Sequence, residues 1–337
     1  MTNKEQAARP LQVAVVGVGY LGQHHARVYA EMDSVELVGV ADTDAARANE
    51  IAERFGVPAF GDYRELAPRV DAVNVVSPTV THHEIARFFL QASVDVLLEK
   101  PMTTTIAEAE ELIAIGEAGK RILQVGHIER FNGAVRELAR LVKNPGFIEA
   151  HRLGTFVGRA TDVDVVLDLM IHDIDIILSL VPSAVKDVRA SGVPVITPNV
   201  DIANARLEFE NGCVANVTAS RVSTTPQRKT RFFQPDTYIS LDFQEQKVDC
   251  YRRVGDPRDY LKGQPPRIVQ EQVTISKEEP LKVELESFIH AVRHRQRPLV
   301  SGEEGLKALQ VATDIMAAIQ SSARRMEDAP QGPECPE

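Results

Sequence analysis

The chain up to Gly126 alternates short apolar runs with amphipathic stretches, and this alternation constrains the fold more than any other feature. The apolar runs, such as LQVAVV and VELVGVA, are continuous rather than polar at every second residue. Continuous apolar strands separated by helices are typical of a parallel sheet covered on both faces. We therefore expect a doubly wound α/β domain, with strands at 11–16, 35–41, 72–76, 94–98 and 122–125 and helices at 21–32, 45–55, 84–92 and 106–118.

After a helix expected at 134–143 the pattern changes to successive strands with short turns. Residues 202–210 alternate with period two, and the Asn211-Gly212 pair that follows predicts a hairpin turn. We expect an α+β domain with a large open, mostly antiparallel sheet, helices on one side of it, and final helices at 280–293 and 303–324. The predicted strands are 148–156, 187–192, 202–210, 213–221, 228–234, 237–243, 247–252 and 267–276.

The length of 337 residues suits two domains. We place a Rossmann domain at 1–127, a substrate-binding and oligomerisation domain at 128–325, and a flexible tail at 326–337. A sheet with one open face is often buried between subunits, so a homodimer or homotetramer is expected through this sheet.

Composition narrows the function classes. A net charge of −10 and the lack of Trp argue against nucleic-acid binding. The three cysteines are widely spaced, which favours reduced thiols in the cytoplasm. The N-terminus has no apolar signal region, and no stretch reaches the roughly 18 apolar residues of a membrane span. We therefore expect a cytoplasmic protein without membrane insertion.

The sequence GVGYLG at 17–22 has the G-x-G-x-x-G pattern and lies between the first expected strand and helix. That position is typical of a dinucleotide site, in which a helix N-terminus receives the pyrophosphate. Asp42 ends the second expected strand, where a carboxylate binds the ribose hydroxyls and favours NAD over NADP. The predicted ligands are Gly17, Gly19, Tyr20, Leu21, Gly22 and Asp42. His24 and His25 on the same helix are expected only to cap or to pack.

Glu99-Lys100-Pro101 follows the strand expected at 94–98. Ligands bind at the carboxyl ends of strands in such a sheet, so Lys100 is expected at the cofactor cleft as an acid or base. Pro101 would suit a cis peptide bond. Taken alone, the position of Lys100 favours a solvated surface lysine.

A second polar cluster follows helical spacing. Asp168, His172 and Asp175, with Asp164, are predicted to share one stripe of a helix. A histidine flanked by carboxylates can act as a general base for a hydroxyl, although a structural, hydrogen-bonded histidine is the alternative. A metal site is not expected, because no cluster of His or Cys accompanies the motif.

Together these motifs resemble the Gfo/Idh/MocA family of sugar oxidoreductases, over roughly residues 11–325. The resemblance implies that Lys100 and His172 are catalytic, that Asp168 supports them, and that NAD is the cofactor. It also implies that the loop after the third strand lines the dinucleotide. The residues assigned to the cofactor in this way are Ser77, Pro78, Thr81 and His82, and Glu99 of the Glu99-Lys100-Pro101 motif is also assigned to it.

Within the family, GHIERFN at 126–132, HRLGTF at 151–156 and NVTASRVS at 216–223 are similar to the branch acting on UDP-N-acetylglucosamine or its uronic acid. That branch oxidises the sugar 3-hydroxyl ahead of a transaminase, in lipid A or surface-polysaccharide synthesis. The implied substrate ligands are Arg130, Asn132, Arg152, Arg159, Asp175 and Arg221.

Two departures concern substrate identity: Met170 replaces a small residue, and Thr161-Asp-Val-Asp-Val-Val replaces a Gly-rich run. A dehydrogenase of inositol or a simple hexose is one alternative function. A non-catalytic NAD-binding regulator is another, although such a protein would not need both Lys100 and His172.

Overall fold

The computed structural model describes residues 9–156 and 163–327, which form two compact units. The first unit comprises Met1–Phe131 and Glu278–Leu306, and the second comprises Asn132–Lys277 and Lys307–Glu337. Residues 328–337 of the predicted tail lie outside the described residues.

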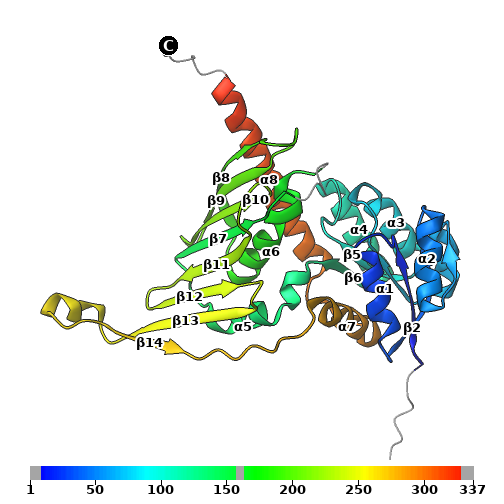
Figure 1. Ribbon diagram of the computed structural model, residues 1–337, viewed down its shortest axis with the longest axis horizontal. Coiled ribbons are helices and arrows are strands. Elements are labelled where there is room, and N and C mark those ends of the chain that lie inside the picture. Colours follow the sequence, from blue (N-terminus) through cyan, green and yellow to red (C-terminus); the bar gives the residue numbers. More distant parts are fainter. Residues whose placement is uncertain (1–8, 157–162, 328–337) are drawn as a thin grey trace, which may run out of the picture. The chain divides into compact units, whose positions relative to one another are not determined.

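The first unit is built on a parallel sheet with the strand order β3-β2-β1-β4-β5-β6. Helix α1 packs with α2 and α7, whereas α3 packs with α4 (Figure 1). The strand order reverses between β1 and β4, as a doubly wound sheet requires. The strands are β1 (Leu11–Val16), β2 (Val35–Ala41), β3 (Ala59–Phe60), β4 (Ala72–Val75), β5 (Asp95–Glu99) and β6 (Leu123–Gly126). The helices are α1 (Gly22–Ala30), α2 (Ala45–Phe55), η1 (Tyr63–Arg69), α3 (Thr79–Gln91), α4 (Ile106–Gly119), η2 (Ile128–Phe131) and α7 (Pro280–His294).

The doubly wound prediction is confirmed, but the unit is not continuous in sequence. Leu285 and Phe288 of α7 lie in the same apolar core as Val13 and Val15 of β1. Residues 278–306 were predicted to belong to the second domain, because chain order alone does not show which core a late amphipathic helix will join. The short β3 and η1 were also not predicted.

The second unit is built on a sheet with the order β14-β13-β12-β11-β7-β10-β9-β8. Neighbouring strands are antiparallel except for the pair β7 and β10, which confirms the predicted open, mostly antiparallel sheet. The strands are β7 (Phe147–Leu153), β8 (Val185–Val193), β9 (Ile202–Phe209), β10 (Val214–Ser220), β11 (Gln227–Phe233), β12 (Thr237–Asp242), β13 (Lys247–Val254) and β14 (Arg267–Glu271). The helices are α5 (Gly133–Leu141), η3 (Val166–Met170), α6 (Ile171–Leu180), η4 (Pro257–Lys262) and α8 (Gly302–Glu327), which starts in the first unit's segment.

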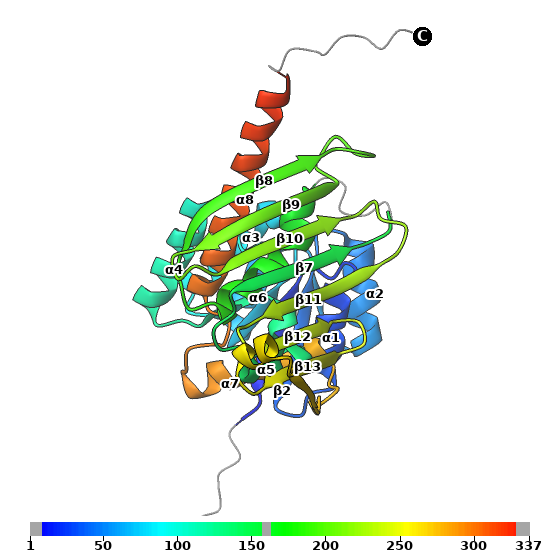
Figure 2. The same cartoon turned by 90° about the vertical axis from the view of Figure 1, so that its left-hand side faces the viewer.

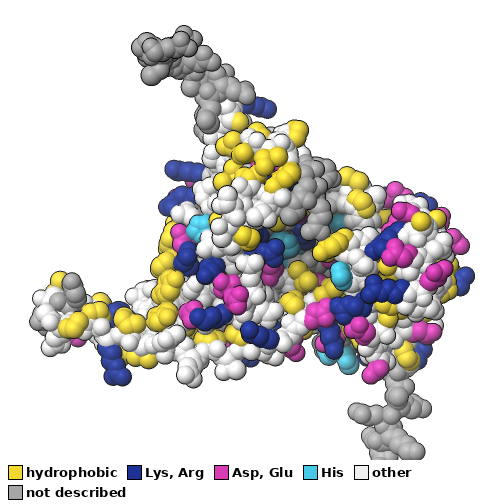
Figure 3. All heavy atoms as spheres, in the orientation of Figure 1, with side chains coloured by type: hydrophobic (Ala, Val, Ile, Leu, Met, Phe, Trp, Pro, Cys, Tyr) yellow, Lys and Arg dark blue, Asp and Glu magenta, His cyan; other side chains and the backbone are white. Residues whose placement is uncertain are grey.

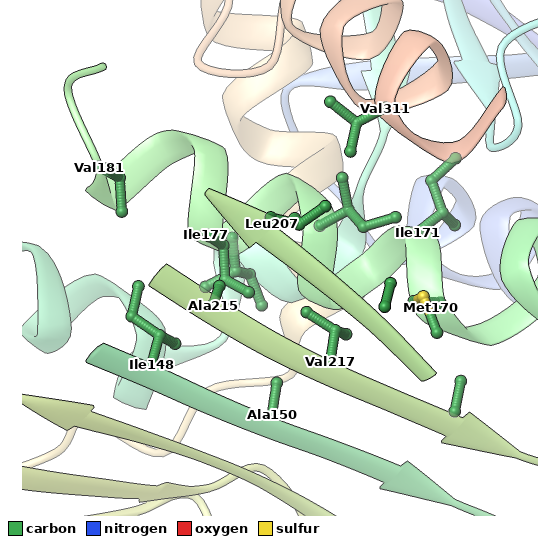
Figure 4. Packing of buried hydrophobic residues seen from close by; sticks show 14 of the residues in the cluster. Ile148, Ala150, Met170, Ile171, Ile177, Val181, Leu207, Ala215, Val217 and Val311 are labelled. Carbon is green, nitrogen blue, oxygen red and sulfur yellow. The ribbon is translucent and has the colours of Figure 1, made fainter. Parts of the chain in front are cut away.

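One face of this sheet carries the core of the second unit. Ile148 of β7 and Val217 of β10 are fully buried and pack with Ile177 of α6 (Figure 4). Figure 2 shows strands β7 to β11 in front of α6. On the uncovered face, Phe147, Phe233, Tyr238 and Tyr251 form a row of rings with neighbouring centroids 5.3 to 6.1 Å apart.

The surface seen in Figure 3 carries acidic and basic side chains interspersed rather than gathered by sign. Among the described residues, no helix combines the length and the apolar character needed to cross a membrane.

Candidate active site

The glycine loop between β1 and α1 has the backbone that its sequence predicted. Gly17 has a φ of +85°, a conformation that L side chains rarely adopt. A Cβ on Gly22 would lie 1.8 Å from the carbonyl oxygen of Gly17, so only glycine lets the helix start this close to the loop. A Cβ on Gly19 would meet no described atom within 4 Å, which leaves this side of the loop open. The first turn of α1 carries no acidic residue, so its N–H groups suit an anion.

Asp42, directly after β2, holds the glycine loop as well as facing the cleft. Its Oδ2 accepts a hydrogen bond from the Val18 N–H at 2.8 Å, and its Oδ1 accepts one from the Asp44 N–H at 3.0 Å. Each carboxylate oxygen can accept more than one hydrogen bond, so ribose hydroxyls can still bind. The same negative charge disfavours a 2′-phosphate.

A cavity of about 630 Å³ lies over the carboxyl ends of β1, β2 and β4. This volume is in the range of cofactor sites. Eight predicted cofactor residues line it: Gly17, Gly19, Tyr20, Leu21, Asp42, Ser77, Pro78 and Thr81. Gly22, His82 and Glu99 are not among its lining residues.

Three polar lining residues were missed by the sequence analysis: Thr43, Tyr63 and Glu84. Tyr63 donates its hydroxyl hydrogen bond to Glu84 at 2.9 Å, which joins η1 to α3 along one wall of the cavity. Thr43 could have been predicted from its place next to Asp42. The Tyr63–Glu84 contact could not, because no local pattern indicates that these two segments meet.

His82 joins the loop after β4 to the Glu99-Lys100-Pro101 motif. The side chain is fully buried, with Nε2 2.8 Å from the Ser77 carbonyl oxygen and Nδ1 2.9 Å from the Pro101 carbonyl oxygen. Burial lowers the pKa of His82 and outweighs the hydrogen bonds to these carbonyl groups, which favour the protonated form. A neutral imidazole ring donates only one hydrogen bond, so His82 can donate to only one of the two carbonyl groups at a time. We infer a structural role for His82, which links the two segments next to the cavity.

Lys100 follows β5 directly and is half-buried, as expected for a residue at the carboxyl edge of the sheet. The Lys100–Pro101 peptide bond is cis. The Lys100 N–H donates to Oε2 of Glu99 at 3.2 Å, so the preceding side chain folds back onto the lysine backbone. The structure thus places Lys100 at the edge of the first unit that carries the cofactor cavity.

The second predicted cluster lies on a helix that changes its winding. Val166–Met170 forms a π-helix, and the α-helix α6 starts at Ile171. Asp168 lies in the π-helical turn and His172 in the first α-helical turn, and both are half-buried. The regular stripe predicted from 3.6 residues per turn is therefore interrupted, and Asp164 instead accepts a hydrogen bond from the Val200 N–H at 2.8 Å. Wide π-turns recur at functional sites, and their presence cannot be predicted from spacing.

Two predicted substrate ligands of the second unit lie in its interior. Arg152 is 3% exposed and binds Asp173 through two nitrogens, at 2.7 and 3.3 Å. Arg221 is 6% exposed, and its Nε lies 3.7 Å from the buried Asp201. The structure thus gives both guanidinium groups a structural task, and their role in substrate binding stays a prediction.

The remaining predicted substrate ligands lie in different places. Arg130, in the first unit, lies 3.9 Å from Glu304. Asn132 caps α5, because its Oδ1 accepts from the Ala134 N–H at 3.0 Å. Asp175 is buried within α6, and Arg159 lies outside the described residues.

The first unit has a glycine loop that opens a helix, an acidic residue after the second strand, and a cavity where the strand order reverses. These features are typical of dinucleotide-binding enzymes. Comparison with protein families identifies the group. Residues 11–127 match the oxidoreductase family with an NAD-binding Rossmann fold, and residues 106–237 match the Gfo/Idh/MocA C-terminal domain. The chain belongs to the Gfo/Idh/MocA oxidoreductase family and is an NAD-dependent dehydrogenase.

Individual proteins that are similar to this chain are also named as dehydrogenases. The chain is 36% identical to UDP-N-acetylglucosamine 3-dehydrogenase of Acidithiobacillus ferrooxidans, over 94% of this chain and 99% of that protein. A solved structure of that enzyme covers 93% of this chain and 99% of its own, with a TM-score of 0.86. The myo-inositol 2-dehydrogenase of Thermotoga maritima is 29% identical over 89% of this chain and 93% of its own length.

Proposed function

We propose that the enzyme oxidises a secondary hydroxyl of a sugar nucleotide with NAD, and that its substrate is UDP-N-acetylglucosamine or the corresponding uronic acid, attacked at the 3-hydroxyl. The observation that carries this proposal is the 36% identity, along nearly the whole of both chains, to a relative with this named activity. The product would be a 3-keto sugar, whose carbonyl is the group that a transaminase converts to an amine.

The first unit has the features that NAD requires. The N–H groups at the start of α1 would bind the pyrophosphate, the open side of Gly19 would let it approach, and Asp42 would bind the adenosine ribose. NAD, when bound, supplies the acceptor for the hydride that leaves the sugar carbon.

Side chains of the protein would accept the proton of the substrate hydroxyl. We assign Lys100 and His172 to the substrate hydroxyl, one of them taking its proton while the Lys100 cation stabilises negative charge developing on the oxygen. Asp168 would support His172. These roles rest on the motif resemblance, together with the position of Lys100 after β5 and of His172 beside the π-turn.

A second candidate substrate is a free inositol or simple hexose. It is favoured by the burial of Arg152 and Arg221 in ion pairs, since a nucleotide diphosphate needs cationic groups that it can reach. The named activity of the Thermotoga maritima relative is of this kind. The uncovered aromatic row on the second unit's sheet supports the further proposal of a homodimer or homotetramer.

The test is NADH formation at a fixed NAD concentration with a panel of UDP-sugars, inositols and plain hexoses, with a sugar transaminase added to remove the keto product. We expect turnover with UDP-N-acetylglucosamine that is lost in Lys100→Ala and His172→Ala. Lys282→Ala and His24→Ala, both exposed, are the matched controls and should retain activity. Turnover with inositols or hexoses alone would exclude the sugar-nucleotide proposal and support the second candidate.

A further inference from the structure

A chain of buried polar side chains runs through the first unit to the motif that holds Lys100. The Tyr29 hydroxyl donates to Oδ1 of Asn74 at 2.7 Å, and Nδ2 of Asn74 lies 2.9 Å from Nδ1 of His25. Nε2 of His25 lies 3.3 Å from Oε1 of Glu99. Tyr29, Asn74 and His25 are at most 2% exposed. Burying a polar group costs free energy unless the group is hydrogen-bonded. We therefore expect a connected network of buried polar side chains at this position to have a physical role.

Each hydrogen bond in this series of side chains is donated in the direction of Glu99. Because Oδ1 of Asn74 accepts from Tyr29, the amide presents its NH₂ group to His25. Nδ1 of His25 must then accept, which places the ring proton on Nε2, toward Glu99. Tyr29 and Asn74 therefore select the tautomer of His25 that can donate to the glutamate.

Glu99 receives hydrogen bonds on both of its carboxylate oxygens. Oε1 faces His25, and Oε2 accepts from the backbone N–H of Lys100 at 3.2 Å. The end of β6 makes room for this arrangement, since a Cβ on Gly126 would lie 2.9 Å from Oε1 of Glu99. The carboxylate is thus held between α1, the Lys100 backbone and a strand end at which a side chain larger than glycine would displace it.

A second carboxyl group approaches the same network from α7. Glu284 is fully buried, and neither of its carboxyl oxygens has a hydrogen-bond partner within the described part of the chain. Burial, and then the negative charge of Glu99, raise the pKa of Glu284 well above its usual range. Burial would also raise the pKa of Glu99, but the hydrogen bond from His25, the charge of Lys100 and the hydrogen bond from the Lys100 backbone outweigh it and lower that pKa.

The ionisable groups that face Glu99 are His25 from α1, Lys100 next to it in sequence, His82 from α3 and Glu284 from α7. Of these two carboxyl groups, Glu99 is therefore the more readily ionised and Glu284 the more readily protonated. The group that favours the charged form is the one bound to the backbone of Lys100.

We propose that His25 is a positioning residue for the oxidation. Its Nε2–H orients the Glu99 carboxylate against the backbone of Lys100, and this contact fixes the position of Lys100 at the edge of the sheet. This proposal rests on the proposed role of Lys100 as an acid or base. It gives His25 a task beyond packing, whereas its neighbour His24 is exposed on the same helix.

The first test needs no substrate. The infrared absorption of protonated carboxyl groups is followed against pH in the NAD-bound enzyme, with Glu99→Gln and Glu284→Gln used to assign the bands. In His25→Leu the protonation midpoint of Glu99 should rise by about one to two pH units, the effect of losing one hydrogen bond to a buried charge. In His25→Gln, whose amide can still donate to Glu99, most of the shift should disappear.

The second readout is turnover. We expect His25→Leu to lower kcat at least about tenfold while the KM for NAD changes less than about twofold, because His25 does not line the cofactor cavity. His25→Gln should recover most of kcat, and His24→Ala should match the unaltered enzyme.

An unshifted Glu99 midpoint in His25→Leu, with only thermal stability reduced, would overturn the proposal and leave His25 a packing residue. If His25→Leu does not fold, Tyr29→Phe takes its place, with a smaller shift in the same direction expected and no shift counting against the proposal. A shifted midpoint in an enzyme that oxidises none of the sugars would support the positioning of Glu99 and refute the proposed function instead.

Discussion

The Asp42 carboxylate accepts two backbone hydrogen bonds while it lines the cofactor cavity, so its removal would disturb both the loop and the ligand. Substitution by Asn keeps the loop contact in part, because the amide oxygen can still accept from the Val18 N–H while the negative charge and the hydrogen bond from the Asp44 N–H are lost. We expect Asp42→Asn to raise the ratio of kcat/KM for NADP to that for NAD by at least about tenfold, or about 1.4 kcal/mol. Kinetics with both cofactors measure this ratio, and an unchanged ratio would show that Asp42 only holds the loop.

At the residue scale, half of the residues that line the cavity were predicted. The glycine turn and the acid at a fixed offset are local features, and Ser77, Pro78 and Thr81 were implied by the family resemblance. Tyr63, Glu84 and the network of His25 could not be predicted, because their partners come from distant segments. The arginines illustrate the same limit. The sequence next to Arg152 and Arg221 does not predict the buried carboxylates with which they form ion pairs.

At the element scale, the ion pair between Arg152 and Asp173 fastens α6 to β7, next to His172 in sequence. The Arg152 guanidinium also lies over the Phe243 ring, 5.0 Å from its centroid. Arg152→Met would leave Asp173 buried and unpaired with its arginine, so the free energy of unfolding should fall by about 3–5 kcal/mol. Urea denaturation measures this loss.

The double variant Arg152→Met with Asp173→Leu should recover most of that stability, since removing both charges removes the desolvation cost. Arg189→Ala, which breaks the exposed pair with Asp187, is the matched control and should change stability by less than about 1 kcal/mol. A double variant as unstable as Arg152→Met would show that packing, and not the ion pair, holds α6.

The loop between β8 and β9 depends on Asp201, which is fully buried. Burial would raise the pKa of Asp201, but the backbone N–H groups of Val195, Ile196 and Thr197 and the Thr197 hydroxyl outweigh it and hold that pKa well below its usual range. A depressed folded-state pKa contributes stability that is present above the unfolded value, about 3.9, and is lost as pH falls through the folded value.

We therefore expect Asp201→Asn to lower the free energy of unfolding by about 2 kcal/mol at pH 7. The difference from the unaltered protein should shrink as the pH falls below about 4, because Asp201 then loses its advantage. Urea unfolding at several pH values checks this, with the exposed Asp187→Asn as control. A difference that does not depend on pH would argue against the carboxylate as the source of stability.

Elements with a strong pattern were predicted well, whereas the irregular ones were not. The continuous strands of the first sheet and the alternating β9 match their predicted positions within a residue or two. The π-turn Val166–Met170 was missed, because its sequence is equally compatible with an α-helix and only tertiary packing selects the wider turn.

At the scale of the whole molecule, the sequence predicted two folding units of the correct kinds, but not the discontinuity of the first. The segment Glu278–Leu306 returns from the second unit's sheet to the core of the first, and α7 brings Glu284 to the network around Glu99. The apolar face of an amphipathic helix shows that it will be buried, but not against which core.

The central claim is that this chain removes a hydride from a secondary carbinol carbon and transfers it to NAD. The most direct measurement uses UDP-N-acetylglucosamine carrying deuterium at C3, with the reduced cofactor analysed by mass spectrometry. We predict that the deuterium appears in the reduced nicotinamide, one label per turnover, and that NADH formation slows with the labelled substrate. Reduced cofactor without deuterium, or labelled substrate that keeps its deuterium while the unlabelled hexoses turn over, would contradict the account.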